Sequence, residues 1–175
     1  MRREKAEIGD CPRFPPKTYT VTHPLHSRLY GGILDYAVGK SATFLLVVRD
    51  SLGLSARATG LLERLRDFLV KDYRSSRWPG TELIKGSARL LEYTYTCESK
   101  DILKHVTKGL YDWKQPDLPE DLCLLRASGD VWMATISHER DAFFEMGTEE
   151  LRTMLRHIPD LGNYVKEEGE SADTI

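Results

Sequence analysis

An unbroken apolar run at residues 44–48, directly after Thr43, constrains the fold of this chain more than any other segment. It lacks the polar alternation of a strand with one wet face, and turn-forming residues flank it at Gly39 and at positions 50–53. A short run of this kind is typical of a strand buried on both faces of a sheet. We therefore expect a central strand at residues 43–48 with cover on both sides.

Apolar residues at helical spacing predict the elements that cover this strand. Ser27 is placed to cap the first of these segments, and Ser55 precedes the longest, whose apolar stripe extends to Leu69. Ser99 is expected to cap the third segment, which Pro116 must end. The helical segments are residues 28–37, 55–69, 99–113 and 148–158.

Alternating side chains and turn residues predict the remaining strands. A Ser-Gly turn at residues 127–130 separates two β-rich runs and indicates a hairpin. One face of the segment 88–96 carries Leu90 and Glu92, which predicts contact with water there. Residues 74–80 are expected to form a loop. The expected strands are residues 18–22, 43–48, 88–96, 122–126, 131–136 and 142–146.

This order of elements predicts an α+β domain, with helices packed on a mainly antiparallel sheet. The strictly repeated strand–helix–strand units of a parallel sheet do not occur in the sequence. The single domain is expected at residues 17–162, with a flexible lead-in at residues 1–16 and an acidic flexible tail at residues 163–175. A chain of 175 residues is suited to one such domain.

The composition excludes several classes of protein. Hydrophobic residues make up 41% and charged residues 30%, which is typical of a folded chain rather than a disordered one. The net charge of −2 provides no overall attraction to nucleic acid or to anionic membranes. Three widely spaced cysteines, together with a start that lacks an apolar signal segment, favour a cytoplasmic protein with reduced thiols.

The densest polar cluster lies at residues 137–141, between two predicted strands. His138 is a candidate general acid or base for a small hydrolase-like enzyme, with Glu139 or Asp141 to orient its imidazole. Ser137 and His138 point to opposite faces of a strand, so they form no nucleophile and base unless the chain turns sharply there. The alternative is a charged turn without a catalytic role.

Acidic and aromatic residues around a proline-containing linker suggest a second candidate site. The acids offer the oxygen ligands of a catalytic carboxylate pair or of a hard cation, although a solvated surface loop explains them with fewer assumptions. Rigid aromatic anchors with a charged rim are typical of recognition surfaces, whereas burial in the core is the alternative for the tryptophans. The predicted binding residues are Tyr111, Trp113, Asp117, Glu120, Asp121, Arg126 and Trp132.

A basic stretch and a pair of histidines offer two further interpretations. Basic residues outnumber acidic ones at residues 57–77, and the nearby Trp78 could stack on a base, but a solvated helix face explains the same charges. His23 and His26 with Cys11 lack a second closely spaced ligand pair, so we expect no metal site. No cofactor motif occurs, and no cofactor is expected.

Three segments resemble a family of small bacterial proteins of uncharacterised function. They are residues 110–113 (LYDW), 118–126 (LPEDLCLLR) and 132–139 (WMATISHE). Some members of this family are labelled stage III sporulation protein AH. The resemblance covers roughly the middle and C-terminal half of the chain, implies a bacterial source and brings no catalytic residues with it.

The leading hypothesis from the sequence is a non-enzymatic bacterial protein-binding domain of the immunity or antitoxin type, whose partner is a toxin. It follows from the missing catalytic motifs and from the residues grouped around one linker, and the size and layout are similar to those of immunity proteins. The recognition surface is expected at residues 110–121 and 126–141. A small hydrolase using His138 is the first alternative, and nucleic-acid binding through residues 57–77 is the second.

Overall fold

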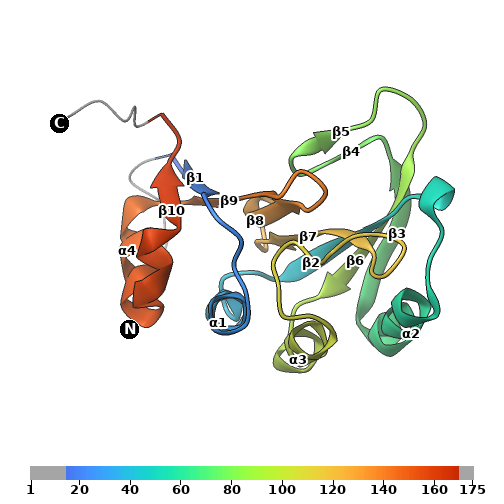
Figure 1. Ribbon diagram of the computed structural model, residues 1–175, viewed down its shortest axis with the longest axis horizontal. Coiled ribbons are helices and arrows are strands. Elements are labelled where there is room, and N and C mark those ends of the chain that lie inside the picture. Colours follow the sequence, from blue (N-terminus) through green and yellow to red (C-terminus); the bar gives the residue numbers. More distant parts are fainter. Residues whose placement is uncertain (1–14, 170–175) are drawn as a thin grey trace, which may run out of the picture.

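The chain folds around an eight-stranded sheet, as the computed structural model shows for residues 15–169 (Figure 1). Its strands are β1 (Lys17–Val21), β2 (Thr43–Val48), β3 (Leu69–Ser75), β6 (Ala88–Thr94), β7 (Glu120–Leu125), β8 (Val131–Ile136), β9 (Asp141–Met146) and β10 (Val165–Glu167). They lie in the order β10-β1-β9-β8-β7-β2-β6-β3, and neighbouring strands run antiparallel. The predicted α+β fold with a mainly antiparallel sheet is confirmed.

Helices cover one face of this sheet, and a small hairpin lies over the other. The helices are α1 (Arg28–Ala37), α2 (Ala56–Leu65), α3 (Cys97–Val106) and α4 (Thr148–His157), and the hairpin is β4 (Arg77–Trp78) with β5 (Thr81–Glu82). In Figure 1, α1, α3 and α2 lie side by side below the sheet, α4 lies beside β10, and the hairpin lies above. None of the helices within residues 15–169 has both the length and the apolar composition that crossing a bilayer requires.

Strand β2 lies inside the sheet, between β7 and β6, and is buried on both faces. Phe44 and Leu46 face the helices and belong to the main core. Val47 faces the opposite side, where Trp78 of the hairpin helps to cover it in a second, smaller core. The prediction of a strand at residues 43–48 with cover on both sides is therefore confirmed.

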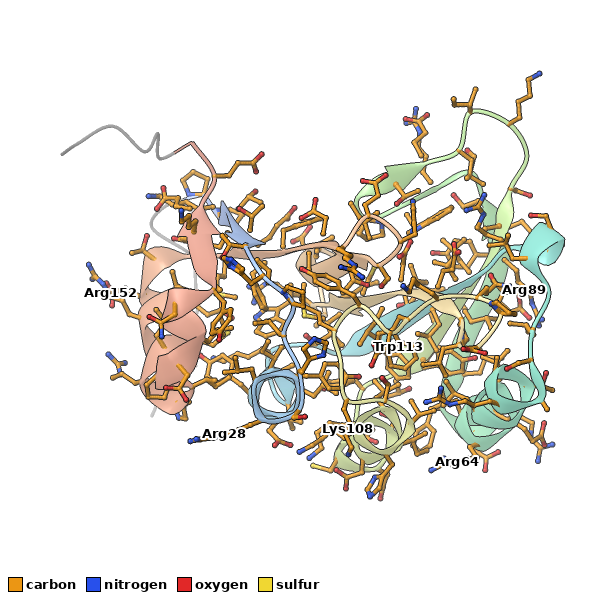
Figure 2. The ribbon with its side chains drawn as sticks, in the orientation of Figure 1. Arg28, Arg64, Arg89, Lys108, Trp113 and Arg152 are labelled. Carbon is orange, nitrogen blue, oxygen red and sulfur yellow. The ribbon has the colours of Figure 1, made fainter. Side chains whose placement is uncertain are left out.

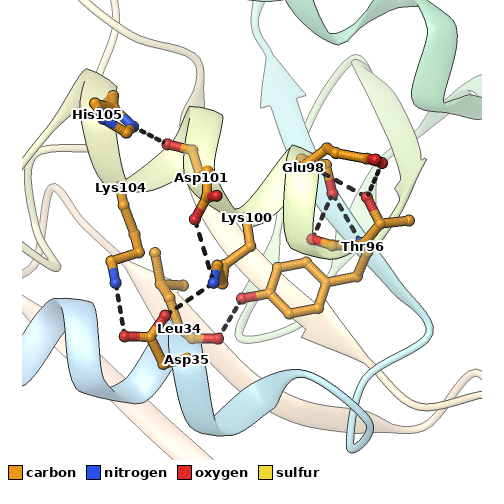
Figure 3. Close-up of polar contacts among 10 residues, drawn as sticks. Leu34, Asp35, Thr96, Glu98, Lys100, Asp101, Lys104 and His105 are labelled. Atoms are coloured by element: carbon orange, nitrogen blue, oxygen red, sulfur yellow. Dashed lines mark hydrogen bonds and ion pairs between the residues drawn. The ribbon is translucent and has the colours of Figure 1, made fainter.

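Polar contacts join the two helices that lie below the middle of the sheet, α1 and α3. Figure 3 shows Lys100 and Lys104 of α3 reaching the carboxylate of Asp35 on α1, at 3.0 and 2.6 Å. The Tyr95 hydroxyl, at the end of β6, donates a hydrogen bond to the Leu34 carbonyl at 2.8 Å. The Tyr95 bond connects α1 to the sheet. Partial burial raises the pKa of Asp35, but the hydrogen bonds and charges of Lys104 and Lys100 outweigh it, so the pKa is lowered.

The predicted helix at residues 55–69 is too long at its C-terminal end. Helix α2 ends at Leu65, and a 3₁₀ turn, η2 (Arg66–Phe68), leads directly into β3. Leu69 fits the apolar stripe of a helix by its spacing, yet it begins a strand that pairs with β6. Hydrogen bonds across the sheet thus override helical periodicity in a segment that also contains β-forming residues.

Helix α3 is also shorter than the predicted segment 99–113. Thr96 is its N-cap, and the Thr96 hydroxyl accepts a hydrogen bond from the Ser99 N–H, so Ser99 is not the cap. The helix ends at Val106, and the chain continues as an irregular loop up to β7. In α1, by contrast, Ser27 precedes the helix as predicted but makes no side-chain capping bond.

The predicted solvated face of β6 is buried at Leu90 and Glu92 and exposed at Thr94. Leu90 is 1% exposed because the β4–β5 hairpin, which includes part of the predicted loop at residues 74–80, covers this side of the sheet. Glu92 is 8% exposed, and its carboxylate accepts hydrogen bonds from the Thr43 hydroxyl and from Lys71. These two hydrogen bonds replace water around the Glu92 carboxylate, which allows it to be buried on this face of the sheet.

Part of the predicted flexible tail at residues 163–175 belongs to the sheet. Val165–Glu167 form β10, which pairs with β1 through Tyr19 to Val21. The backbone hydrogen bonds of the sheet order this polar segment, which sequence composition alone does not predict. Residues 1–14 of the predicted lead-in lie outside the described part of the chain.

Cover on both faces of β2 leads to a stability prediction. We expect Val47→Ala to lower the free energy of unfolding by about 2 kcal/mol, because the side chain is fully buried in the second core. Val70→Ala on β3 is the matched control, since Val70 is 52% exposed, and its effect should stay within about 0.5 kcal/mol. Urea denaturation measures both, and equal effects would contradict the burial of this face.

Candidate functional site

Strand β7 begins with an irregularity that organises the candidate site. Glu120 pairs with Val47 of β2 and Cys123 pairs with Leu45, so β7 advances by one residue more than its neighbour. This is the geometry of a β-bulge, and Asp121 within it has a φ of 51°. Left-handed backbone is uncommon for any residue with a side chain and is best tolerated by Asp and Asn. Such strain is concentrated at functional sites in proteins.

The carboxylate of Asp121 is fully buried and receives two hydrogen bonds. The backbone N–H of Ser137, just beyond β8, donates to Oδ1 at 2.9 Å, and the indole N–H of Trp78, in the hairpin, donates to Oδ2 at 2.8 Å. Burial raises the pKa of this carboxyl above its usual range, and the two hydrogen bonds work against that rise. Asp121 therefore joins three separate elements at one point.

Glu120 lies beside Asp121 with its side chain only 6% exposed. Its Oε2 atom is buried and has no hydrogen-bond partner. The nearest cation is Arg49, whose Nη1 lies 3.6 Å from Oε2, which is an ion-pair contact beyond hydrogen-bonding distance. Burial and the adjacent charge of Asp121 raise the pKa of the Glu120 carboxyl, whereas Arg49 lowers it.

His138 completes the cluster from the turn between β8 and β9. One ring nitrogen of His138 and one carboxylate oxygen each from Glu120 and Asp121 all lie within 4.8 Å of one another. We call these three residues the acid–imidazole cluster. The side chain of His138 is 44% exposed, whereas the two acids are buried, so the imidazole stands between the carboxylates and solvent.

The structure thus gives His138 different neighbours from those the sequence suggests. Glu139 lies near it, with 3.6 Å between His138 Nε2 and Glu139 Oε1, but the Glu139 side chain is 63% exposed. Asp141 begins β9. Ser137 is buried, and its hydroxyl donates to the Thr135 hydroxyl rather than to His138. The buried carboxylates that the fold gathers with His138 are therefore those of Glu120 and Asp121.

The predicted aromatic anchors lie in the core. Trp113 and Trp132 are 0% exposed and Tyr111 is 6% exposed. The indole N–H of Trp113 donates to the Tyr30 hydroxyl at 3.3 Å, and Figure 2 shows Trp113 between the sheet and the helices. In this arrangement the three rings offer no exposed face to a partner.

Arg126 and Trp132 serve instead to attach α4 to the sheet. Arg126 donates to both carboxylate oxygens of Glu150 at 3.3 and 2.8 Å, and the Trp132 indole donates to the same carboxylate at 2.9 Å. Three charge-assisted bonds on one partly buried carboxylate constitute a structural tie. Asp117 remains exposed, and its backbone carbonyl accepts a hydrogen bond from the Ser55 hydroxyl.

The basic residues of the 57–77 segment are largely neutralised by carboxylates. They are divided between α2, η2, β3 and β4, so they form no single helix face. Figure 2 shows Arg64 on the outside of α2. The ion pairs are Arg66 with Glu63, Lys71 with Glu92, Arg74 with Asp50, and Arg77 with Glu82.

The two histidines considered as metal ligands lie apart from the acid–imidazole cluster. His23 interacts with the hydroxyl of Thr22 at 3.0 Å and packs edge-on against Tyr164. His26 forms an isolated β-bridge with Gly109. Cys11 lies outside the described residues. Within residues 15–169, the one group of three His, Cys, Asp or Glu ligands with metal-binding spacing is the acid–imidazole cluster.

The sequence assigned no role at this site to three residues: Arg49, Gln115 and Trp78. Arg49 directly follows the buried strand β2, and a charged residue at the end of such a strand is a candidate functional residue that the sequence could have indicated. Gln115 accepts a hydrogen bond from the Arg49 N–H and donates one to its carbonyl, at 2.6 and 3.0 Å, which holds the backbone there. Trp78 had no such signal, because only the tertiary fold brings the hairpin over β7.

Comparison with known proteins provides no assignment for this site. We found no family model, no curated protein and no solved structure that matches the chain. The functional argument therefore depends on the geometry and electrostatics of the acid–imidazole cluster.

The two hydrogen bonds to Asp121 predict a specific loss of stability. In Asp121→Asn, the amide has one acceptor oxygen for two donors, so either Ser137 or Trp78 faces an NH₂ group. We expect a loss of about 2 kcal/mol in the free energy of unfolding at pH 7. Asp67→Asn, at a side chain that is 90% exposed, should change it by less than about 0.5 kcal/mol. Urea unfolding measures these differences. If Asp121→Asn were as stable as the wild type, the carboxylate could not be accepting both hydrogen bonds.

The raised pKa of Glu120 predicts a dependence of stability on pH. Because the folded protein binds this proton more tightly than the unfolded chain, the contribution of Glu120 is largest below the unfolded pKa of about 4.3. It decreases as pH rises through the folded value. Glu120→Gln cannot titrate, so the variant should gain stability relative to the wild type as pH rises above about 4. Urea midpoints in metal-free buffer measure the difference, and a constant difference would contradict this prediction.

Proposed function

We propose that this domain is a small hydrolase whose reacting centre is the acid–imidazole cluster. The observation that carries the proposal is the Oε2 atom of Glu120, which is buried without a hydrogen-bond partner beside Asp121 and His138. A buried oxygen without a hydrogen bond costs about 1–3 kcal/mol. The ion pair with Arg49 at 3.6 Å offsets only part of this cost, so the arrangement favours a group that binds there during function.

The cluster has the components that water activation requires. Glu120 offers a free acceptor for a water proton, and His138 lies at the solvent-facing side, where a substrate can approach. Arg49 supplies a positive charge 3.6 Å from Glu120, in a position to stabilise negative charge that develops on a substrate oxygen. Asp121, whose oxygens accept hydrogen bonds from Ser137 and Trp78, keeps the centre rigid.

Binding to a protein partner, of the immunity or antitoxin type, is the second candidate function. Its support is strand β3, an edge of the sheet on which Val70 and Tyr73 are 52% and 42% exposed. Exposed edge strands pair readily with other chains. The residues of this edge differ from the binding residues that the sequence suggests, most of which are buried or engaged in structural contacts.

Hydrolysis by the cluster predicts a clear pattern among variants. In a panel of chromogenic ester, amide and phosphoester substrates, Glu120→Gln and His138→Ala should each lower kcat/KM for the substrate that is turned over by roughly a hundredfold or more. Glu63→Gln and His105→Ala are matched controls at exposed positions on α2 and α3, and they should retain activity.

Circular dichroism and urea unfolding must show that all four variants fold. Full activity in both cluster variants would refute the assignment of this centre. A wild-type protein that hydrolyses no substrate class would also refute the hydrolase proposal, and it would favour the partner-binding candidate.

A further inference from the structure

The acid–imidazole cluster has the donor set of a metal site. It combines two carboxylate oxygens with one imidazole nitrogen. Carboxylates alone favour Mg²⁺ and Ca²⁺, whereas an imidazole shifts the preference toward Zn²⁺, Mn²⁺ and related ions. Three protein ligands are also the number found in catalytic zinc sites, where further positions stay open for water and substrate.

The distances are close to those that coordination requires. Bonds from Zn²⁺ to oxygen and nitrogen are about 2.0–2.2 Å long, so two ligand atoms of a tetrahedral site lie roughly 3.4 Å apart. All three ligand atoms lie within 4.8 Å of one another. Coordination therefore requires the ligand atoms to approach one another by at most about 1.4 Å, and His138, whose side chain is 44% exposed, has the room to move.

Glu120 provides evidence of a ligand that is independent of the spacing. Its side chain is more than nine-tenths buried, and Oε2 has no hydrogen-bond partner. Buried carboxylates in proteins are normally hydrogen-bonded, paired with a cation or coordinated to a metal. The Arg49 guanidinium at 3.6 Å neutralises this carboxylate only from a distance, so a coordinating ion would satisfy it better.

Asp121 is held in the orientation that a ligand needs. Ser137 and Trp78 each occupy one acceptor site on its carboxylate, at 2.9 and 2.8 Å, and each oxygen keeps a second lone pair. Hydrogen bonds of this kind to a ligating carboxylate fix its rotamer and are typical of metal sites. The bulge with its φ of 51° directs this carboxylate toward Glu120 and His138.

We propose that Glu120, Asp121 and His138 bind one divalent transition-metal ion of the Zn²⁺ or Mn²⁺ type. The role of the ion rests on the proposed function, because a bound ion lowers the pKa of water and so prepares it for hydrolysis. Its binding rests on the cluster geometry alone. Arg49 competes with the ion for Glu120, and its side chain, which is 34% exposed, can move away from this carboxylate when the ion enters and still face a substrate oxygen.

Mn²⁺ binding to the full-length chain without a histidine tag tests the proposal. Electron paramagnetic resonance of free Mn²⁺, with Zn²⁺ as a competitor, should show one site in the wild type. Glu120→Gln and His138→Ala should each weaken binding by about tenfold or more. Glu63→Gln and His105→Ala should leave it unchanged, and Arg49→Gln should strengthen it several-fold because a competing positive charge is removed.

The outcomes separate this proposal from the hydrolase proposal. The absence of Mn²⁺ and Zn²⁺ binding at millimolar concentration, or binding that is equal in the wild type and both cluster variants, overturns the metal site. Hydrolysis that survives exhaustive chelation overturns the catalytic role of the ion and leaves the hydrolase intact. Binding of one ion that depends on Glu120 and His138, without hydrolysis of any substrate, supports the metal site and overturns the hydrolase.

Discussion

The buried carboxylate of Asp121 is the interaction on which the rest of the site depends. Its two oxygens accept hydrogen bonds from the backbone of Ser137 and from the indole of Trp78, so one side chain connects the start of β7, the end of β8 and the β4–β5 hairpin. Burying a carboxylate is unfavourable unless donors replace water, and these two donors provide that replacement. The hairpin in turn covers the second face of β2. The carboxylate of Asp121 therefore both anchors the β4–β5 hairpin over the sheet and fixes the position of the candidate site.

The β-bulge that turns Asp121 into the protein also sets the arrangement of the acid–imidazole cluster. It places Glu120 next to Asp121 with a buried oxygen that lacks a hydrogen-bond partner, and the turn after β8 brings His138 to both of them. Burial raises the pKa of both carboxyl groups, and the adjacent charge of Asp121 raises that of Glu120 further. A site of this kind is less stable than an apolar core of the same volume, and buried acids and backbone strain of this kind are concentrated at functional sites.

Local patterns in the sequence predicted most of the fold. The buried run at residues 43–48, the hairpin formed by β7 and β8, and the last helix are confirmed because their periodicity and turn residues agree with the tertiary structure. Leu69 misled the prediction because it continues a helical stripe, yet it begins the edge strand β3. For the site, Glu120 and Asp121 were identified together in one hypothesis, and His138 was identified in another. These residues come together through a β-bulge and a turn, which the spacing of residues in the sequence does not predict. Composition also does not distinguish a buried tryptophan from one exposed for binding, and both Trp113 and Trp132 are buried.

The central claim is that Asp121, Glu120 and His138 form one preorganised centre that coordinates a cation. Anomalous diffraction at the manganese edge, from crystals of the untagged protein grown with Mn²⁺, examines this most directly. The account predicts a peak at roughly 2.0–2.6 Å from an oxygen of each acid and from a ring nitrogen of His138. Arg49 should then be turned away from Glu120. Well-ordered crystals that show these three side chains without a manganese peak between them would contradict the account.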